Sequence, residues 1–300
     1  MARAVLIANP VAARTSPEVA ETVWRVFKAA GWGIDVRETT APGDARVFAR
    51  DAVTAGADLV AVFGGDGTTM QAAAALVETG VPLGLVPGGT GNVLAGNLRI
   101  PTGPVQAAEL ILRGRARAID LGRIERTDGP HYFAVACGAG ADARVMGGTD
   151  PGSKRRLGIG GYFNTLFRVL PEIRSTRFVV TVDGERIEAQ ASVVLVLNCS
   201  EVIPPLVRIG PGARIDDGVL DVLFVSADTP WEAVRGVWRA MANVMFETGE
   251  TAYLRYARGR EITIEADPIE PVQFDGDLAG STPVTAVVQP GALRVMAPEP

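Results

Sequence analysis

Histidine is almost absent from this sequence: His131 is the only one in 300 residues. It follows the turn-forming stretch Thr-Asp-Gly-Pro and opens a strand-like apolar run, so we interpret it as a residue at the start of a strand. Ser-His-Asp and Cys-His triads need a histidine as the base, so catalysis of that kind is not expected. Acid–base chemistry is then expected from carboxylates, lysines or tyrosines.

Lysine and cysteine are also scarce. The two lysines, Lys28 and Lys154, lie outside the glycine-rich segments, and the P-loop pattern GxxxxGK[ST] is missing. The two cysteines, Cys137 and Cys199, each stand in an apolar run without CxxC or Cys/His spacing. This pattern predicts neither a disulfide framework nor a zinc site, and it is typical of a reducing cytosol.

Long apolar runs and an excess of basic charge are missing as well. No run reaches the roughly 18 apolar residues that a membrane-spanning helix needs. The N-terminal apolar run stops at Asn9-Pro10, which favours a first strand over a signal peptide. The formal net charge of −5 argues against nonspecific binding to nucleic acid. We therefore expect a cytoplasmic protein without a nucleic-acid partner.

Strand-like and helix-like runs alternate through the first third of the chain. This order, with short loops, predicts a parallel sheet covered by helices on both faces. The expected strands are residues 4–9, 33–39, 58–64 and 82–87. The expected helices are residues 16–31, 43–56, 68–80, 92–98 and 102–115, the first of them capped by Ser16 with Pro17 in its first turn.

After about Ala118 the sequence changes to short strands separated by turn residues. This pattern predicts an antiparallel β-sandwich, interrupted by helices at about 160–173 and 231–247. Segments 283–291 and 292–298 are predicted as separate strands. The expected fold class is thus α/β plus β: a doubly wound parallel-sheet domain followed by an antiparallel β-sandwich domain. The expected bounds are residues 1–120 and 121–290, with the tail 291–300 packing back on the first domain.

Two glycine-rich loops carry the main functional signal. Gly64–Thr68 (GGDGT) and Pro87–Asn92 (PGGTGN) each follow a strand and precede a helix. Glycine lets a ligand approach the backbone, and a helix N-terminus favours phosphate, so the two loops together predict a phosphate site. Asp66 would repel phosphate unless a cation lies between them, which indicates a metal-bound nucleotide; the alternative is a local cap. Asn92 is expected to cap the helix that follows it.

The paired loops resemble the diacylglycerol kinase and sphingosine kinase superfamily of lipid kinases, in its soluble bacterial branch. NAD kinases and phosphofructokinases share a GGDG loop, but the second loop and the β-rich second half favour the lipid branch. Further segments that resemble the family occur in the same order: Asn9-Pro10, Thr39–Ala45, ACGAGADARV, ARIDDGVLDV and FDGD.

The resemblance implies ATP in the first domain and Mg²⁺ as cofactor, with Asp66 acting near the phosphates and their metal. The implied nucleotide contacts are Asn9, Thr39, Gly64, Gly65, Asp66, Gly67, Thr68, Gly89, Thr90 and Asn92. It also implies a structural Mg²⁺ held by the Asp217 side chain and the carbonyls of Arg214 and Val219. From spacing alone, a metal-free Asp-Asp-Gly hairpin is favoured at this turn.

Two Asp-Gly-acidic segments are candidates for the catalytic base. Asp183–Glu185 is flanked by alternating strand patterns, so we predict a hairpin turn there. The later segment, Phe274–Gly280, is expected to lack a returning strand immediately after it. Its position fits the catalytic Asp-Gly-Glu of the family, which implies Asp277 as the base in place of glutamate.

The expected substrate is a lipid hydroxyl at a membrane surface, with diacylglycerol as the default acceptor. The basic cluster Lys154–Arg156 precedes an apolar helix, which either rests on anionic lipid at the membrane periphery or belongs to the core. A homodimer is a possible assembly. The alternatives are an NAD kinase-like enzyme, an NAD(P)-binding protein that uses the GxGxxA pattern at Gly138–Ala143, and a noncatalytic nucleotide- or lipid-binding protein.

Overall fold

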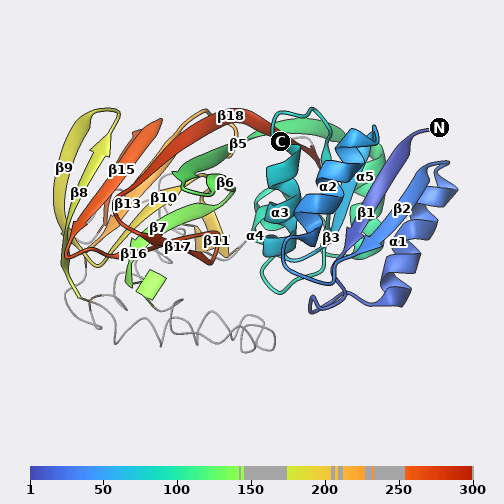
Figure 1. Cartoon of the computed structure of the whole chain (residues 1–300), viewed down its shortest axis with the longest axis horizontal. Coiled ribbons are helices and arrows are strands. Elements are labelled where there is room, and N and C mark those ends of the chain that lie inside the picture. Colours follow the sequence, from blue (N-terminus) through green and yellow to red (C-terminus); the bar gives the residue numbers. More distant parts are fainter. Residues whose placement is uncertain are drawn as a thin grey trace. The chain divides into compact units, whose positions relative to one another are not determined.

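The structure is a computed structural model that describes residues 1–141, 143, 144, 174–203, 207, 208, 212–226, 232 and 254–298. The chain divides into two compact units (Figure 1). Unit 1 comprises Met1–Ile119 and Gly291–Pro300, and unit 2 comprises Asp120–Pro290.

A parallel sheet forms the centre of unit 1. Its strands are β1 (Arg3–Ala8), β2 (Gly33–Glu38), β3 (Leu59–Gly64) and β4 (Leu83–Pro87), in the order β2-β1-β3-β4. Every residue of β3 and β4 is buried, as expected for strands covered on both faces. The order reverses between β1 and β3, and ligands of such sheets bind where the order reverses.

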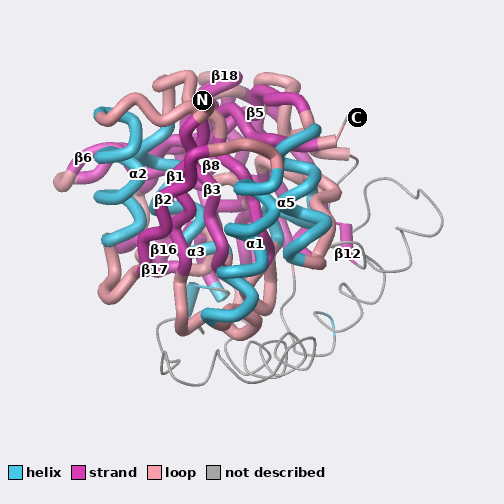
Figure 2. Tube along the Cα trace, turned by 90° about the vertical axis from the view of Figure 1, so that its right-hand side faces the viewer, coloured by secondary structure: helices cyan, strands magenta, loops and turns pink. Residues whose placement is uncertain are grey.

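Five helices accompany this sheet: α1 (Pro17–Ala29), α2 (Asp44–Thr54), α3 (Asp66–Leu76), the short α4 (Val93–Asn97) and α5 (Pro104–Arg113). Because parallel crossovers are right-handed, the reversal of strand order puts α1 on the opposite face from α2 and α3. Consistently, α2 packs on α3 and α1 packs on α5, which lies beside α1 in Figure 2. Helix α1 begins as predicted: the Ser16 side chain accepts a hydrogen bond from Val19 N at 3.3 Å.

Unit 2 is a sandwich of two mainly antiparallel sheets. One contains β6 (Gly129–Phe133), β8 (Thr176–Val182), β9 (Glu185–Ala191), β15 (Glu261–Asp267) and the parts of β5 (Arg115–Arg126) and β18 (Val284–Ala297) that lie between Asp120 and Pro290. The other has the order β14 (Leu254–Gly259), β13 (Leu220–Val225), β10 (Val193–Leu197), β7 (Ala136–Gly140), β16 (Pro271–Phe274) and β17 (Asp277–Ser281). A separate small ribbon pairs β11 (Glu201–Ile203) with β12 (Val207–Arg208).

The core of unit 2 is filled from both sheets. Phe178 and Val180 of β8 and Ile264 of β15 pack in one cluster with Val196 of β10 and Val222 of β13. Along β8 buried positions alternate with more exposed ones, which is the pattern of a strand with one face on the core. These two architectures confirm the predicted doubly wound α/β domain and antiparallel β-sandwich.

Two local predictions were wrong. Residues 283–291 and 292–298 do not form two strands, because β18 runs through Pro290 and Gly291 as one strand of 14 residues. The strand β17 follows Asp275-Gly276 directly, so the FDGD segment is a hairpin. The predicted helices at 160–173 and 231–247 lie outside the described residues, apart from Glu232. Among the described residues, no helix is long and apolar enough to cross a membrane.

Candidate functional site

The predicted nucleotide contacts in unit 1 lie at the carboxyl ends of four neighbouring strands. Asn9 follows β1, Thr39 follows β2, and the two glycine-rich loops follow β3 and β4. Asn9 Nδ2 donates a hydrogen bond to Thr68 Oγ1 at 2.8 Å, which joins the β1 and β3 ends where the strand order reverses. The Thr39 amide donates to the Ala8 carbonyl at 2.9 Å, which holds Thr39 beside the β1 end.

The two glycine-rich loops touch each other through their backbones. Gly88 N donates to Gly64 O at 2.8 Å. A Cβ atom on Gly89 would lie 2.6 Å from Gly65 Cα, far inside van der Waals contact. Gly64, Gly65, Gly67, Gly88 and Gly89 do not lie in the left-handed region of φ. Glycine is therefore required at Gly89 because a Cβ there would overlap Gly65, rather than because the turn needs unusual backbone angles.

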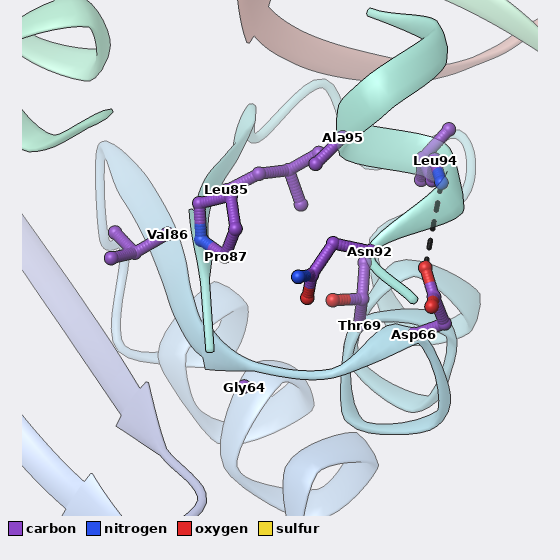
Figure 3. A pocket seen from close by; sticks show the side chains of 9 residues that line it. All are labelled: Gly64, Asp66, Thr69, Leu85, Val86, Pro87, Asn92, Leu94 and Ala95. Atoms are coloured by element: carbon purple, nitrogen blue, oxygen red, sulfur yellow. Dashed lines mark hydrogen bonds between the residues drawn. The ribbon is translucent and has the colours of Figure 1, made fainter. Parts of the chain in front are cut away.

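Asp66 spans the gap between the two loops. It is half-buried at the start of α3, and its Oδ1 accepts a hydrogen bond from Leu94 N at 3.4 Å in α4 (Figure 3). Burial raises the pKa of the Asp66 carboxyl, and the amides of Leu94, Val93 and Asn92 oppose part of this rise. The carboxylate thus contacts the N-terminus of the helix after the second loop, and a nearby cation would favour its charged form.

Asn92 occupies the N-cap position of α4, as predicted, but its side chain makes no capping hydrogen bond. The residue adopts a left-handed conformation (φ 50°), and its side chain turns back to Gly89. Its Oδ1 accepts from Gly89 N at 2.9 Å, and its Nδ2 donates to Gly89 O at 2.8 Å. Asn92 therefore closes the second loop on itself. Thr90 is half-buried within that loop.

A small void lies behind the loops (Figure 3). Its volume is about 10 Å³, and its wall includes Gly64, Asp66, Thr69 and Asn92. A space of this size holds at most about one water molecule. The void itself is therefore too small for a nucleotide, whereas Gly67 is exposed at the start of α3.

The segment after Thr39 is tied down by Asp44, a residue missing from our predicted contacts. Asp44 Oδ2 accepts from Thr40 N, Thr40 Oγ1 and Ala41 N at 2.7, 2.9 and 2.8 Å. Hydrogen bonds from the Thr40 and Ala41 amides lower the pKa of this carboxyl. Gln71 of α3 accepts from Gly43 N at 3.0 Å, so the segment is also attached to the first glycine-rich loop's helix. The sequence could have predicted these bonds, because an aspartate side chain often accepts hydrogen bonds from backbone amides a few residues away, as Asp44 does here.

The turn at Asp217 in unit 2 contains the predicted ligands of a structural cation. The Asp217 carboxylate forms an ion pair with Arg258, and its Oδ1 accepts from Val219 N at 3.4 Å. Arg258 also contacts Asp221 Oδ1 at 3.3 Å, and Asp120 Oδ2 accepts from Gly218 N at 2.6 Å.

The charges around this turn are out of balance. Asp221 is 5% exposed, and its Oδ2 is buried without a hydrogen-bond partner. Burial raises the pKa of Asp221, Arg258 lowers it, and the nearby Asp217 charge raises it further. Two carboxylates, Asp217 and Asp221, therefore share the Arg258 guanidinium. This donor set fits a hard cation with oxygen ligands, although no cluster of three or more metal-ligating side chains is found in the described part of the chain.

The two Asp-Gly-acidic segments have nearly the same backbone geometry. Asp183-Gly184 joins β8 to β9 with φ values of 48° and 89°, and Asp275-Gly276 joins β16 to β17 with 45° and 91°. Positive φ at both positions is typical of a two-residue type I′ hairpin. The hairpin prediction for Asp183 is confirmed. Both segments are followed directly by a return strand, so the lack of such a strand does not distinguish Asp277 from the Asp183–Glu185 segment as the candidate base. Asp277 is exposed as the first residue of β17, opposite Phe274.

Comparisons with known proteins agree with the arrangement in both units. Residues 3–124 match the family model described as the diacylglycerol kinase catalytic domain. Residues 135–297 match the model described as the YegS C-terminal NAD kinase beta sandwich-like domain.

Individual relatives cover most of the chain. It is 32% identical over 293 residues to a probable lipid kinase YegS-like protein of Chromohalobacter salexigens, covering 94% of this chain and 89% of the relative. It is 31% identical over 273 residues to a diacylglycerol kinase of Mycobacterium tuberculosis, covering 89% and 86%. An uncharacterized protein of Synechocystis is 28% identical over 247 residues, which are 81% of this chain but only 55% of that longer protein.

A solved structure has the same fold. The crystal structure of a diacylglycerol kinase from Bacillus anthracis is similar with a TM-score of 0.80 and 25% identity. The similarity covers 98% of this chain and 96% of the other.

Proposed function

Because this chain belongs to the family defined by the diacylglycerol kinase catalytic domain, we propose that it is an ATP-dependent lipid kinase acting on diacylglycerol. The observation that carries the proposal is the contact of the two glycine-rich loops at the ends of β3 and β4. It brings backbone amides and the start of α3 to the edge of a doubly wound sheet, where phosphate groups bind. Relatives that are named diacylglycerol kinase support the choice of acceptor.

The nucleotide would lie across the outer side of the loops in unit 1. Gly65 has no side chain that could cap α3, so the first amides of this helix suit phosphate oxygens. Asn9 and Thr39 border the loops and would contact the rest of the nucleotide. Asp66 would hold Mg²⁺ near the phosphates, and this ion when bound supplies the positive charge that phosphoryl transfer needs.

The reaction needs a base for the acceptor hydroxyl. The hydroxyl oxygen forms a bond to the γ-phosphorus, the bond from that phosphorus to the bridging oxygen breaks, and ADP leaves with that electron pair. The hydroxyl proton passes to the Asp277 carboxylate. The products are phosphatidic acid and ADP, so atoms and charge balance.

The second cation site is structural in this proposal. Asp217 would supply a side-chain ligand, and Arg214 and Val219 would supply carbonyls. The excess of carboxylates around Arg258 supports a cation here, because it would neutralise Asp217 and Asp221.

The decisive assay uses labelled ATP with mixed micelles of diacylglycerol. Parallel reactions contain monoacylglycerol, sphingosine, phosphatidylglycerol or NAD. We expect labelled phosphatidic acid as the main product. Label in NADP instead would show an NAD kinase-like enzyme, and turnover that no lipid stimulates would refute the lipid kinase.

Variants of Asp277 test the base. Asp277→Asn keeps the size of the side chain and removes the proton acceptor, so kcat should fall by about 10²–10⁴-fold with the KM for ATP nearly unchanged. Asp277→Glu should retain measurable activity. Asp183→Asn, in the other Asp-Gly hairpin, is the matched control and should keep wild-type kcat. If Asp277→Asn keeps wild-type kcat, Asp277 is not the base.

Attachment to the membrane periphery is part of the same proposal, since the acceptor is a lipid. The basic cluster Lys154–Arg156 that suggested it lies outside the described residues. Sedimentation with vesicles of phosphatidylglycerol, compared with phosphatidylcholine, tests it directly: binding to neither would contradict a membrane-bound substrate site.

A further inference from the structure

The hairpin that carries Asp277 is anchored by an unusual set of hydrogen bonds. Asp275, the first residue of the turn, sends its carboxylate to the neighbouring bend between β6 and β7. Its Oδ2 accepts from Ala134 N at 2.7 Å, and its Oδ1 accepts from Val135 N and Ala136 N at 3.0 Å each. One side chain thus satisfies three consecutive backbone amides across about 140 residues of sequence. Bonds to an ionised acceptor are stronger than neutral ones.

The same turn is held at further points. Asp275 N donates to Ala136 O at 2.9 Å, and Gly276 N donates to the buried Gln273 Oε1 at 3.0 Å. Both residues of the turn are therefore held by hydrogen bonds: Asp275 through its carboxylate and its amide, and Gly276 through its amide. Asp277 comes directly after it, so the direction of its side chain depends on how this turn is oriented.

The bend that receives Asp275 is itself braced from its carbonyl side. Asn198 is fully buried, its Nδ2 donates to Ala134 O at 3.0 Å, and its backbone amide donates to Val135 O at 2.9 Å. Asp275 therefore accepts hydrogen bonds from a segment that is also held in place by Asn198.

We propose that Asp275 is a positioning residue: its carboxylate orients the β16–β17 turn and so holds Asp277 in the geometry that proton transfer needs. The inference rests on the proposed role of Asp277 as base. Catalytic groups must be placed closely, and a misplacement of about 1 Å can cost on the order of 10²-fold in rate.

The chain contains a matched control for this idea. Asp183 occupies the same position in the other Asp-Gly hairpin, and its Oδ1 accepts from Arg260 N and Glu261 N at 2.8 Å each. The two turns share φ angles, sequence pattern and the use of the aspartate carboxylate as a backbone acceptor. They differ in two respects. Asp275 uses both carboxylate oxygens to accept from three amides, whereas Asp183 uses Oδ1 to accept from two, and only the Asp275 turn leads into the proposed base.

The test compares Asp275→Asn with Asp183→Asn in the full chain. Asparagine suits both positions of positive φ, so each turn should still form. In Asp275→Asn the amide NH₂ must face at least one of the three backbone amides, and a donor then meets a donor. Both variants should lower the melting temperature. Only Asp275→Asn should lower kcat, on the order of 10²-fold, with the KM for ATP unchanged.

Each outcome decides the inference. Wild-type kcat in Asp275→Asn, together with a large loss in Asp277→Asn, overturns the positioning role and leaves the base in place. An equal loss of kcat in Asp183→Asn shows a general effect of destabilisation and also overturns it. Wild-type kcat in Asp277→Asn refutes the base and the positioning role together. If Asp275→Asn does not fold, Gln273→Met removes the other side-chain anchor of the same turn and must lower kcat in the same direction.

Discussion

The contact between the two glycine-rich loops leads to a sharp prediction about Gly89. In Gly89→Ala, the new Cβ would lie 2.6 Å from Gly65 Cα and 3.1 Å from Asn92 Oδ1. Carbon atoms in contact prefer separations of about 3.5–4.0 Å, so the loops must move apart by roughly 1 Å. The first neighbour is backbone, which cannot rotate away as a flexible side chain could.

The expected cost follows from this overlap. Overpacking of this kind destabilises proteins by about 1–3 kcal/mol. For a unit of this size, that corresponds to a melting temperature lower by roughly 3–9 °C. The same displacement moves the backbone amides that would bind phosphate, so kcat/KM for ATP should fall on the order of 10²-fold.

Gly67→Ala is the matched control for stability. Gly67 lies in the first turn of α3, and a Cβ there would meet nothing within 4 Å. Alanine restricts the unfolded chain more than glycine, so this variant should be about 0.5 kcal/mol more stable than wild type. Differential scanning calorimetry of both variants without nucleotide measures the difference. If Gly89→Ala melts at or above the wild-type temperature, or if both variants are equally destabilised, the loops do not touch as described.

Three further predictions concern carboxylates. Burial raises the pKa of Asp66, so ionisation of this carboxyl lowers the stability of the folded protein as pH rises through that pKa. Asp66→Asn should therefore melt above wild type at pH 7, and the difference in melting temperature should shrink toward pH 3.8. The same variant should lose kinase activity. A wild-type advantage at pH 7 would contradict this. The pKa shift of Asp44 has the opposite direction, because hydrogen bonds lower it, so the ionised carboxyl stabilises the folded protein at neutral pH. Asp44→Asn should therefore melt below wild type at neutral pH, and the difference in melting temperature should vanish as pH falls below 3.8. Wild-type protein should melt higher with Mg²⁺ than with EDTA and Asp217→Ala should not; an equal Mg²⁺ effect in both would place the cation elsewhere.

Much of the architecture could be predicted from the sequence because its causes are local. Ser16 and Pro17 begin α1 through contacts within three residues, and Asp183-Gly184 forms its turn through the backbone preferences of two residues. The alternation of strands and helices likewise follows from side-chain periodicity, and it placed both glycine-rich loops at the ends of consecutive parallel strands.

Other features were decided by the tertiary structure alone. Three contacts depend on how distant elements pack: the Gly65–Gly89 contact, the hydrogen bond that Leu94 N donates to Asp66 across 28 residues, and the one that Ala134 N donates to Asp275 across 141 residues. Two departures from the predictions had local causes instead: the Asn92 side chain bonds to Gly89, three residues before it, and β17 follows the Asp275-Gly276 turn directly. A polar side chain bonds to whichever partner the fold brings within about 3 Å, and sequence distance carries no information about that partner. The sequence by itself thus determined which residues could form the site, and only the packed structure decided which of them meet.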